Sequence, residues 1–95
     1  MTKATRKVEE GKLVEVRVEE GNVRILGDFF MHPEESITGL EKVVAENVDG
    51  GVEPTHRAVE MFLREENVEL LGIDACDVAE TAVEAHVKHE EGDEV

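Results

Sequence analysis

The sequence predicts an α+β domain, in which a small antiparallel sheet carries about three helices packed on one face. Two patterns support this class. Apolar residues recur at every second position near the N-terminus, and at helical spacing after Pro33. Strands that are followed by helices, rather than alternating with them, are typical of α+β proteins. The 95 residues fit a single domain, residues 1–95.

The first predicted strand lies in KLVEVRVEE, residues 12–20. Valine alternates there with charged residues, which is typical of a strand with one buried and one solvated face. EGN, residues 20–22, is a hairpin turn signal. The two segments predict a hairpin whose return strand begins at Val23.

The return strand is predicted over VRILGDFFM, residues 23–31. Alternation places Leu26 and Phe30 on the solvated face. Gly27 is a candidate bulge that would reset this alternation. Two interpretations therefore stay open: Phe29 packs in the core while Phe30 faces a partner, or both rings reach the core around the bulge. In the first, the core face of the strand comprises Val23, Ile25, Phe29 and Met31.

Three helices are predicted after the hairpin. The first covers residues 33–48, with acidic residues in its first turn, where the helix dipole favours them. The second begins near Pro54, and the third follows Asp74, a good N-cap residue. The connector between the last two helices is expected to hold a short strand over residues 68–71.

The two ends of the chain contain little apolar sequence, so residues 1–7 and 90–95 are expected to be flexible. The N-terminus has no apolar stretch of the kind found in secretory signals, and no segment is long enough to span a membrane. We therefore expect a cytoplasmic protein with no membrane partner.

The charge balance excludes one class of partner. There are 24 acidic and 10 basic residues, which give a net charge of −14. Nucleic acid is an unfavourable partner for such a chain, because affinity for it comes largely from Lys and Arg. The acids are spread in pairs along the whole sequence, which favours a surface-wide bias, as expected of a halophilic protein in a salty cell interior, over a single docking patch.

Candidate chemical groups are few. His86 and His89 lie three residues apart near the end of the third helix, where a metal site or a simple dipole interaction would fit; we favour the latter. Cys76 lies in the first turn of that helix, but acidic neighbours oppose thiolate formation. No glycine-rich phosphate loop is present. The sequence therefore predicts no catalytic residue and no metal site.

Two segments carry a resemblance to a known family. GKLVEVRV, residues 11–18, followed by GDFFMHPEESITGLEKVV, residues 27–44, resembles the C-terminal accessory domain of lipoate–protein ligases, and most of all the separate small subunit of the bipartite archaeal form. LLGIDACDVAETAV, residues 70–83, extends it. A difference from the family lies at Glu9 and Glu10, where Pro-Gly often occurs. The family-motif and interface residues are Gly11, Lys12, Leu26, Gly27, Asp28, Phe29, Phe30, His32, Pro33 and Glu34.

The resemblance implies an accessory subunit with no activity alone. In that family a large catalytic subunit binds lipoate, ATP and Mg and makes lipoyl-adenylate. The lipoyl group then passes to a lysine of an acceptor, such as the E2 protein of a 2-oxoacid dehydrogenase or the H protein of glycine cleavage. The small domain is needed chiefly for adenylation, and binds no cofactor alone. Lys12 matches the family lysine, and either reaches toward the partner's nucleotide or only holds the interface.

Two other functional classes remain as alternatives. One is a sulfur-transfer or iron–sulfur scaffold of the SufE or NifU type, whose fold is related to that of the ligase domain. Such a scaffold needs several thiolates or an exposed reactive cysteine, whereas this chain has only Cys76. The other is an interaction module without a ligase partner.

Overall fold

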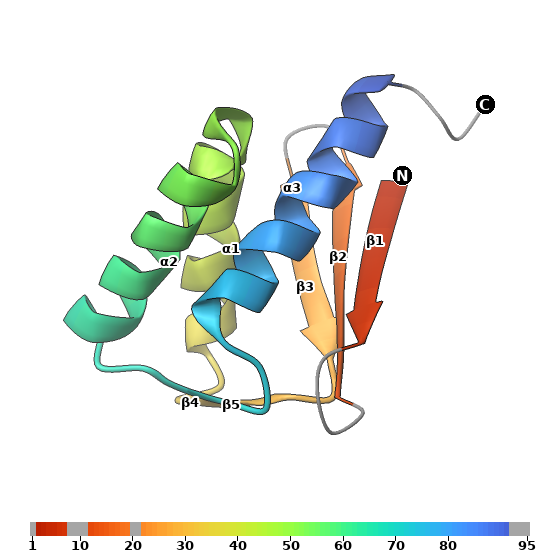
Figure 1. Cartoon of the computed structure of the whole chain (residues 1–95). Coiled ribbons are helices and arrows are strands. Elements are labelled where there is room, and N and C mark those ends of the chain that lie inside the picture. Colours follow the sequence, from red (N-terminus) through yellow and green to blue (C-terminus); the bar gives the residue numbers. More distant parts are fainter. Residues whose placement is uncertain (1, 8–11, 20–21, 92–95) are drawn as a thin grey trace.

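Three antiparallel strands form the main sheet, in the order β1-β2-β3 (Figure 1). The computed structural model describes residues 2–7, 12–19 and 22–91, with the side chain of residue 91 excepted. The strands are β1, Thr2–Lys7, β2, Leu13–Glu19, and β3, Asn22–Gly27. One face of the sheet is covered by helices, and the other carries the charged residues of the strands.

A second, two-stranded sheet lies at one end of the domain, below the helices in Figure 1. It is formed by β4, Phe30–His32, and β5, Glu69–Leu71, which pair in antiparallel fashion. The predicted short strand near residues 68–71 therefore exists. Its partner is the continuation of the hairpin, not the main sheet.

Three helices complete the α+β fold that the sequence predicts. They are α1, Ser36–Asn47, α2, Val52–Glu65, and α3, Ala75–Glu91, with a short 3-10 turn, η2, Val48–Gly50, after α1. α3 packs across β1 and β2, α1 lies against β3, and α2 packs on α1 and α3. The radius of gyration, 12.2 Å, is that of one compact domain of this length.

The core lies between the sheet and the helices. The valines of β2 are fully buried, or nearly so, as the alternation predicts. Gly39 of α1 has no side chain, which leaves room for the Phe62 ring of α2. A Cβ at Gly39 would lie 2.9 Å from that ring. A glycine that weakens α1 locally thus allows α1 and α2 to pack closely. The main aliphatic contributions are Val14, Val16, Val18, Val23, Ile25, Leu40, Val44, Val59, Val78, Ala82 and Ala85.

The expectation of flexibility is wrong for residues 2–7, because Thr2–Lys7 form β1, and residue 1 lies outside the described structure. This strand pairs along its whole length with β2, and its inward-facing residues contact α3. Its core face is Thr2, Ala4 and Arg6, so only one of three inward residues is apolar. At the other end, Glu90 and Glu91 continue α3 rather than forming a tail. Residues 92–95 lie outside the described structure.

The predicted return strand is divided in two. β3 ends at Gly27, whose φ is +153°, and β4 begins at Phe30. The Leu13 carbonyl accepts a hydrogen bond from the Asp28 amide at 2.9 Å, and a Cβ on Gly27 would overlap that carbonyl. Gly27 is therefore needed for its conformation, but it marks a break between two strands and not the predicted bulge inside one.

The helix starts agree with the sequence in one case and differ in two. α1 begins at Ser36, so Glu34 and Glu35 precede its first turn instead of lying in it. α2 begins two residues before Pro54. α3 begins after Asp74 as predicted, since the Asp74 carboxylate accepts the Asp77 amide at 2.9 Å. No helix in the described ranges is long and apolar enough to cross a membrane.

Candidate functional site

The end of the domain that carries β4 and β5 brings together residues from three distant segments. A Cβ built on Gly72 would lie 3.5 Å from the Cα of Phe29 and 3.7 Å from the Cγ of Lys12. Leu13, the residue after Lys12, accepts the hydrogen bond from Asp28. Lys12 and Leu13, the Gly-Asp-Phe-Phe segment and the Gly-Ile step after β5 therefore meet in space.

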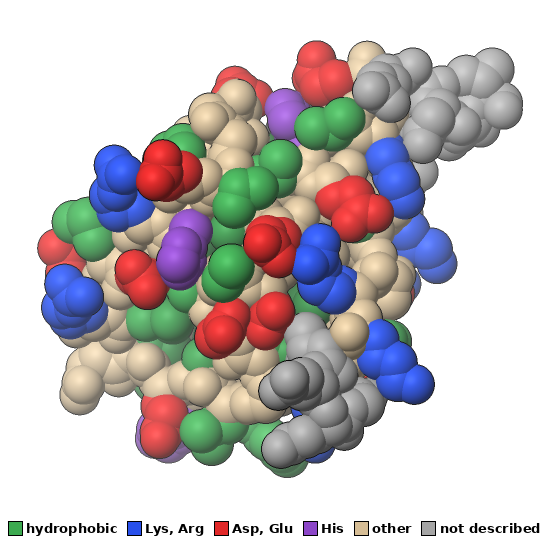
Figure 2. All heavy atoms as spheres, in the orientation of Figure 1, with side chains coloured by type: hydrophobic (Ala, Val, Ile, Leu, Met, Phe, Trp, Pro, Cys, Tyr) green, Lys and Arg blue, Asp and Glu red, His purple; other side chains and the backbone are tan. Residues whose placement is uncertain are grey.

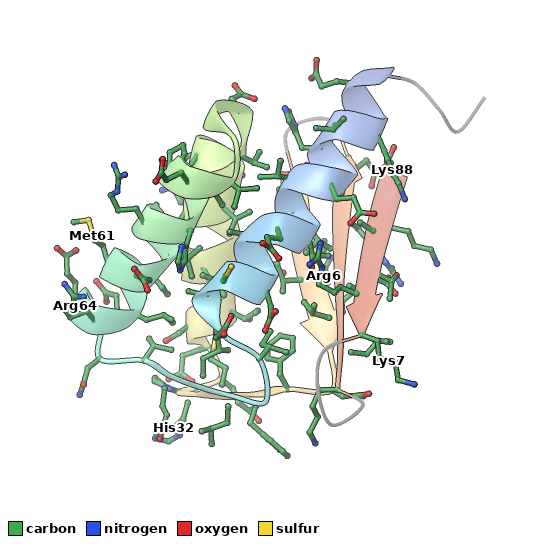
Figure 3. The ribbon with its side chains drawn as sticks, in the orientation of Figure 1. Arg6, Lys7, His32, Met61, Arg64 and Lys88 are labelled. Carbon is green, nitrogen blue, oxygen red and sulfur yellow. The ribbon has the colours of Figure 1, made fainter. Side chains whose placement is uncertain are left out.

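An exposed apolar pair occupies the outer side of this end. Phe30 is 70% exposed and Leu71 is 52% exposed, and the two are directly opposite in the register of β4 and β5. His32 and Glu69 form the next outward-facing pair. We call Phe30, His32, Glu69 and Leu71 the tip surface. Hydrophobic side chains are visible at this lower end of the molecule (Figure 2), and His32 projects there away from the helices (Figure 3).

The inner side of the same ribbon anchors it to the core. Met31 is buried, and Phe29 and Leu70 are half-buried against the core cluster. The structure thus supports the first of the two interpretations of the phenylalanine pair: Phe29 packs inward and Phe30 faces outward. Because Phe29, Met31 and Leu70 hold β4 and β5 against the core, the backbone that carries Phe30 is held in place.

The remaining predicted residues divide between this end and other surfaces. Leu26 is 37% exposed, but it lines a separate groove between β3 and α1. Pro33 and Glu34 form the turn before α1, where the Pro33 carbonyl accepts the Ser36 amide at 3.1 Å. Gly11 lies outside the described residues. The structure therefore unites Lys12, Gly27, Asp28, Phe29, Phe30 and His32, and leaves Leu26 apart.

Three residues of this end were not singled out from the sequence: Glu69, Leu71 and Gly72. Gly72 could have been found from the sequence, because its Gly-Ile step belongs to the segment that carries the family resemblance. Leu71 is different, because a single leucine in a connector does not show which strand it will face. Only the pairing of β5 with β4 identifies it.

Cys76 lies in a setting that opposes thiol reactivity. Its side chain is half-buried. Burial raises the pKa of the Cys76 thiol, and the nearby carboxylates of Glu80, Asp74 and Asp77 raise that pKa further. A thiolate is the nucleophile and the metal-binding form of cysteine, so these neighbours suppress both kinds of chemistry.

The two histidines of α3 turn to different partners. His86 Nε2 lies 3.1 Å from a carboxylate oxygen of Asp49 in η2, whereas His89 Nδ1 lies 3.2 Å from the Thr2 hydroxyl in β1. These contacts join the end of α3 to two other elements. Within the described part of the chain, no group of three His, Cys, Asp or Glu residues is arranged to hold a metal ion.

Comparison with known proteins gives no relative. No protein-family model, no curated protein and no solved structure matches the chain. Functional inference therefore depends on the residues and on their arrangement.

Proposed function

We propose that this chain is the accessory subunit of a two-component lipoate–protein ligase. It docks on a large catalytic subunit through the tip surface, and is required for the ATP-dependent activation of lipoate to lipoyl-adenylate. The catalytic subunit supplies the sites for lipoate, ATP and Mg, and then transfers the lipoyl group to a lysine of an acceptor domain.

The observation that carries the proposal is the convergence of the motif segments beside an exposed aromatic ring. Lys12, Gly27 and Phe29 lie within one small region at the end of the domain, and Phe30 leaves that region toward solvent. An aromatic residue that is exposed beside a second apolar residue is typical of the centre of a protein interface. The tip surface, our best candidate for docking, thus includes Phe30, His32 and Leu71 from the segments that carry the family resemblance.

A supporting role is chemically consistent with the groups at this end. Adenylation requires cations that stabilise the charge developing on the phosphates. Lys12 is the basic residue that the motif segments bring to this region, and its half-buried stem lies beside Gly72. A single lysine at an interface supports a partner's site by position, and does not form a nucleotide site.

The iron–sulfur and sulfur-transfer alternative is disfavoured by Cys76. A scaffold of the SufE or NifU type depends on thiolate chemistry, and the raised pKa of this thiol opposes it. The interaction-module alternative differs from the main proposal only in the partner, so a reconstitution experiment distinguishes the two.

The test is the formation of lipoyl-adenylate from lipoate and ATP by a catalytic subunit that lacks this domain. We expect no product from this chain alone, little from the catalytic subunit alone, and a strong increase when the two are combined. Transfer from preformed lipoyl-adenylate to an acceptor domain should depend on this chain much less. Equal adenylate formation with and without the chain would show that the accessory role is wrong.

A further inference from the structure

The outer face of the main sheet carries a row of three basic residues. In the register, Lys3 of β1 lies opposite Arg17 of β2, and Arg17 lies opposite Arg24 of β3. Neighbouring strands are about 5 Å apart, so the row spans roughly 10 Å. Like charges directly opposite each other destabilise a sheet. We call Lys3, Arg17 and Arg24 the basic row; its arrangement is unfavourable for the isolated domain.

The charge of this face is opposite to that of the whole chain. The total is −14, yet the outward-facing strand residues include four basic and two acidic side chains, a net charge of +2. Figure 2 shows Lys and Arg side chains along the edge of the molecule that β1 forms, and both acidic and basic side chains over the helices. The outward-facing charged residues are Lys3, Lys7, Glu15, Arg17, Glu19 and Arg24.

The arginines of the row are only partly neutralised. The Arg24 side chain is 70% exposed, and its Nε lies 3.8 Å from Glu41, which also accepts the Ile25 amide at 2.8 Å. The Arg17 side chain is 42% exposed, and its Nε donates to Glu15. Both ion pairs are formed at Nε, and both arginine side chains keep exposed surface that a ligand can reach.

A groove beside the row extends the basic surface onto α1. It has a volume of about 540 Å³ and lies between β3 and α1. Three basic residues, Arg17, Arg24 and Lys42, line it beside two acidic ones, Glu19 and Glu41, so its lining has a net charge of +1, and Leu26 and Ala45 add apolar surface. A bound chain would therefore meet cations from two elements, together with a small apolar floor.

We propose that this face binds a short acidic segment of a protein, which places two or three carboxylates on the basic row. A carboxylate can accept two parallel hydrogen bonds from the exposed end of a guanidinium. Alternate residues of an extended segment are about 7 Å apart, so two or three carboxylates match the length of the row.

A short segment fits this face better than a nucleic acid does. Glu15 and Glu19 lie two residues to either side of Arg17 on the same face of β2. These carboxylates flank the row at about 7 Å on either side along β2, so a ligand wider than an extended peptide, such as a nucleic-acid duplex, would bring its phosphates close to them. The basic row is therefore matched to a limited number of negative charges.

The test is an amide NMR titration of the isolated chain with a hexaglutamate peptide, with hexaglutamine as the neutral control. We expect saturable shifts confined to β1, β2, β3 and the residues of α1 around Lys42, and none with hexaglutamine. The double variant Arg17→Gln with Arg24→Gln should weaken binding at least tenfold. The matched variant Arg57→Gln with Arg64→Gln, which changes the net charge equally on exposed α2 residues, should change binding less than twofold (Arg64, Figure 3).

Equal effects of the two double variants, or shifts centred on the helices, would overturn the proposal. Tighter binding of a decathymidine oligonucleotide than of hexaglutamate to the row would assign the face to nucleic acid instead. If the arginine variant does not fold, Lys3→Gln with Lys42→Gln tests the same surface. The experiment uses no catalytic subunit, so its outcome is independent of the proposed ligase role.

Discussion

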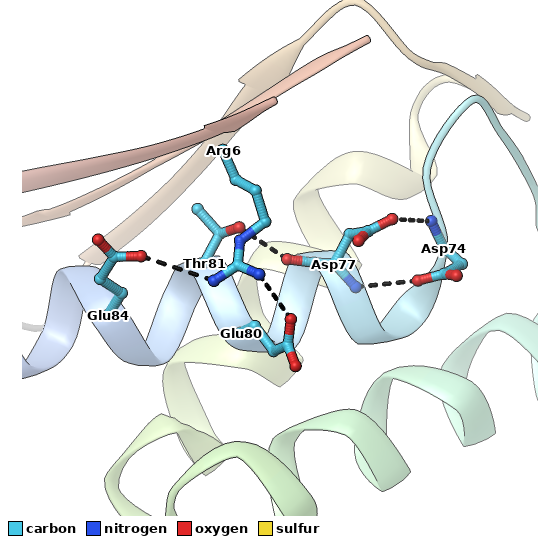
Figure 4. A network of polar contacts seen from close by, with 6 residues as sticks. All are labelled: Arg6, Asp74, Asp77, Glu80, Thr81 and Glu84. Carbon is cyan, nitrogen blue, oxygen red and sulfur yellow. Dashed lines mark hydrogen bonds and ion pairs between the residues drawn. The ribbon is translucent and has the colours of Figure 1, made fainter. Parts of the chain in front are cut away.

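Arg6 of β1 donates a hydrogen bond to Glu80 of α3 at 2.7 Å, and its second terminal nitrogen lies 3.7 Å from Glu84 (Figure 4). This contact joins the first strand to the last helix. It also explains how a basic residue occupies the inward side of an edge strand, because the carboxylates of α3 lie there to receive it.

Replacing Arg6 by Gln should lower the free energy of unfolding by about 0.5–1 kcal/mol in dilute buffer, because the ion pairs are partly exposed and screened. The loss should nearly vanish in about 2 M KCl, where the Debye length is shorter than the contact. Urea unfolding at both salt concentrations measures this. The control is Arg57→Gln, which removes the same charge from an exposed site on α2. Equal losses for the two variants in dilute buffer would contradict a specific role for Arg6.

Asp77 makes stability depend on pH in a defined direction. Burial raises the pKa of the Asp77 carboxyl above its ordinary 3.8, and the nearby Asp74 carboxylate contributes to the rise. A raised pKa in the folded state means that the fold binds this proton more tightly than the unfolded chain does. Ionised Asp77 therefore destabilises the fold above that pKa, and its protonation removes the penalty as the pH falls toward 3.8.

Asp77→Asn keeps an oxygen that can accept the Asp74 amide, which now binds Asp77 at 3.0 Å. We expect this variant to be at least as stable as the natural chain at pH 7, with an advantage that shrinks as the pH falls toward 3.8. Urea unfolding at pH 7, 5 and 4 tests it. Asp77→Ala removes the acceptor as well as the charge, and should be about 1 kcal/mol less stable than Asp77→Asn at pH 7. An advantage of the Asn variant that grows on acidification would refute this account.

Gly27 should tolerate substitution less well than Gly51. Both have positive φ, +153° and +98°, so alanine at either site costs about 1–3 kcal/mol in backbone strain. At Gly51 a Cβ meets nothing within 4 Å, whereas at Gly27 it would overlap the Leu13 carbonyl. Thermal unfolding of Gly27→Ala and Gly51→Ala compares the two directly. If Gly51→Ala were the more damaging change, the contact at Leu13 would have no importance.

The adjacent phenylalanines should separate stability from binding. Phe29 packs against the core, so Phe29→Ala should lower the free energy of unfolding by about 2–4 kcal/mol. Phe30 is largely exposed, so Phe30→Ala should change it by less than about 0.5 kcal/mol. Urea unfolding of the isolated chain measures both. A large loss for Phe30→Ala would mean that both rings are core residues.

Sequence patterns predicted the elements whose apolar periodicity is strong. The alternating valines of β2 and the apolar stripes of the helices are of this kind. They did not reveal β1, because its inward residues Thr2, Ala4 and Arg6 include one apolar side chain. The strand is stabilised by pairing with β2 and by contacts to Glu80, which are tertiary properties that local sequence does not encode.

The candidate site was only partly predicted, because it too depends on tertiary pairing that local sequence does not encode. Alternation offered Phe30 outward and Phe29 inward as one of two interpretations, and the structure supports that one. It could not show that β4 would leave the main sheet and pair with β5, since three-residue strands give almost no periodic signal. Leu71 was missed for that reason. The basic row was missed as well, because it depends on the register of three strands and not on spacing within one.

The most direct test of the ligase proposal is the affinity of the catalytic subunit for this chain with an altered tip surface. We predict that Phe30→Ala with Leu71→Ala weakens binding at least about 30-fold, corresponding to about 2 kcal/mol at an interface centre, and lowers lipoyl-adenylate formation in parallel. Met61→Ala with Val87→Ala removes apolar groups that are 47% and 45% exposed on α2 and α3, and should change the affinity less than twofold. Unchanged affinity for the tip variant, measured by isothermal titration with folded proteins, would contradict the proposed docking surface.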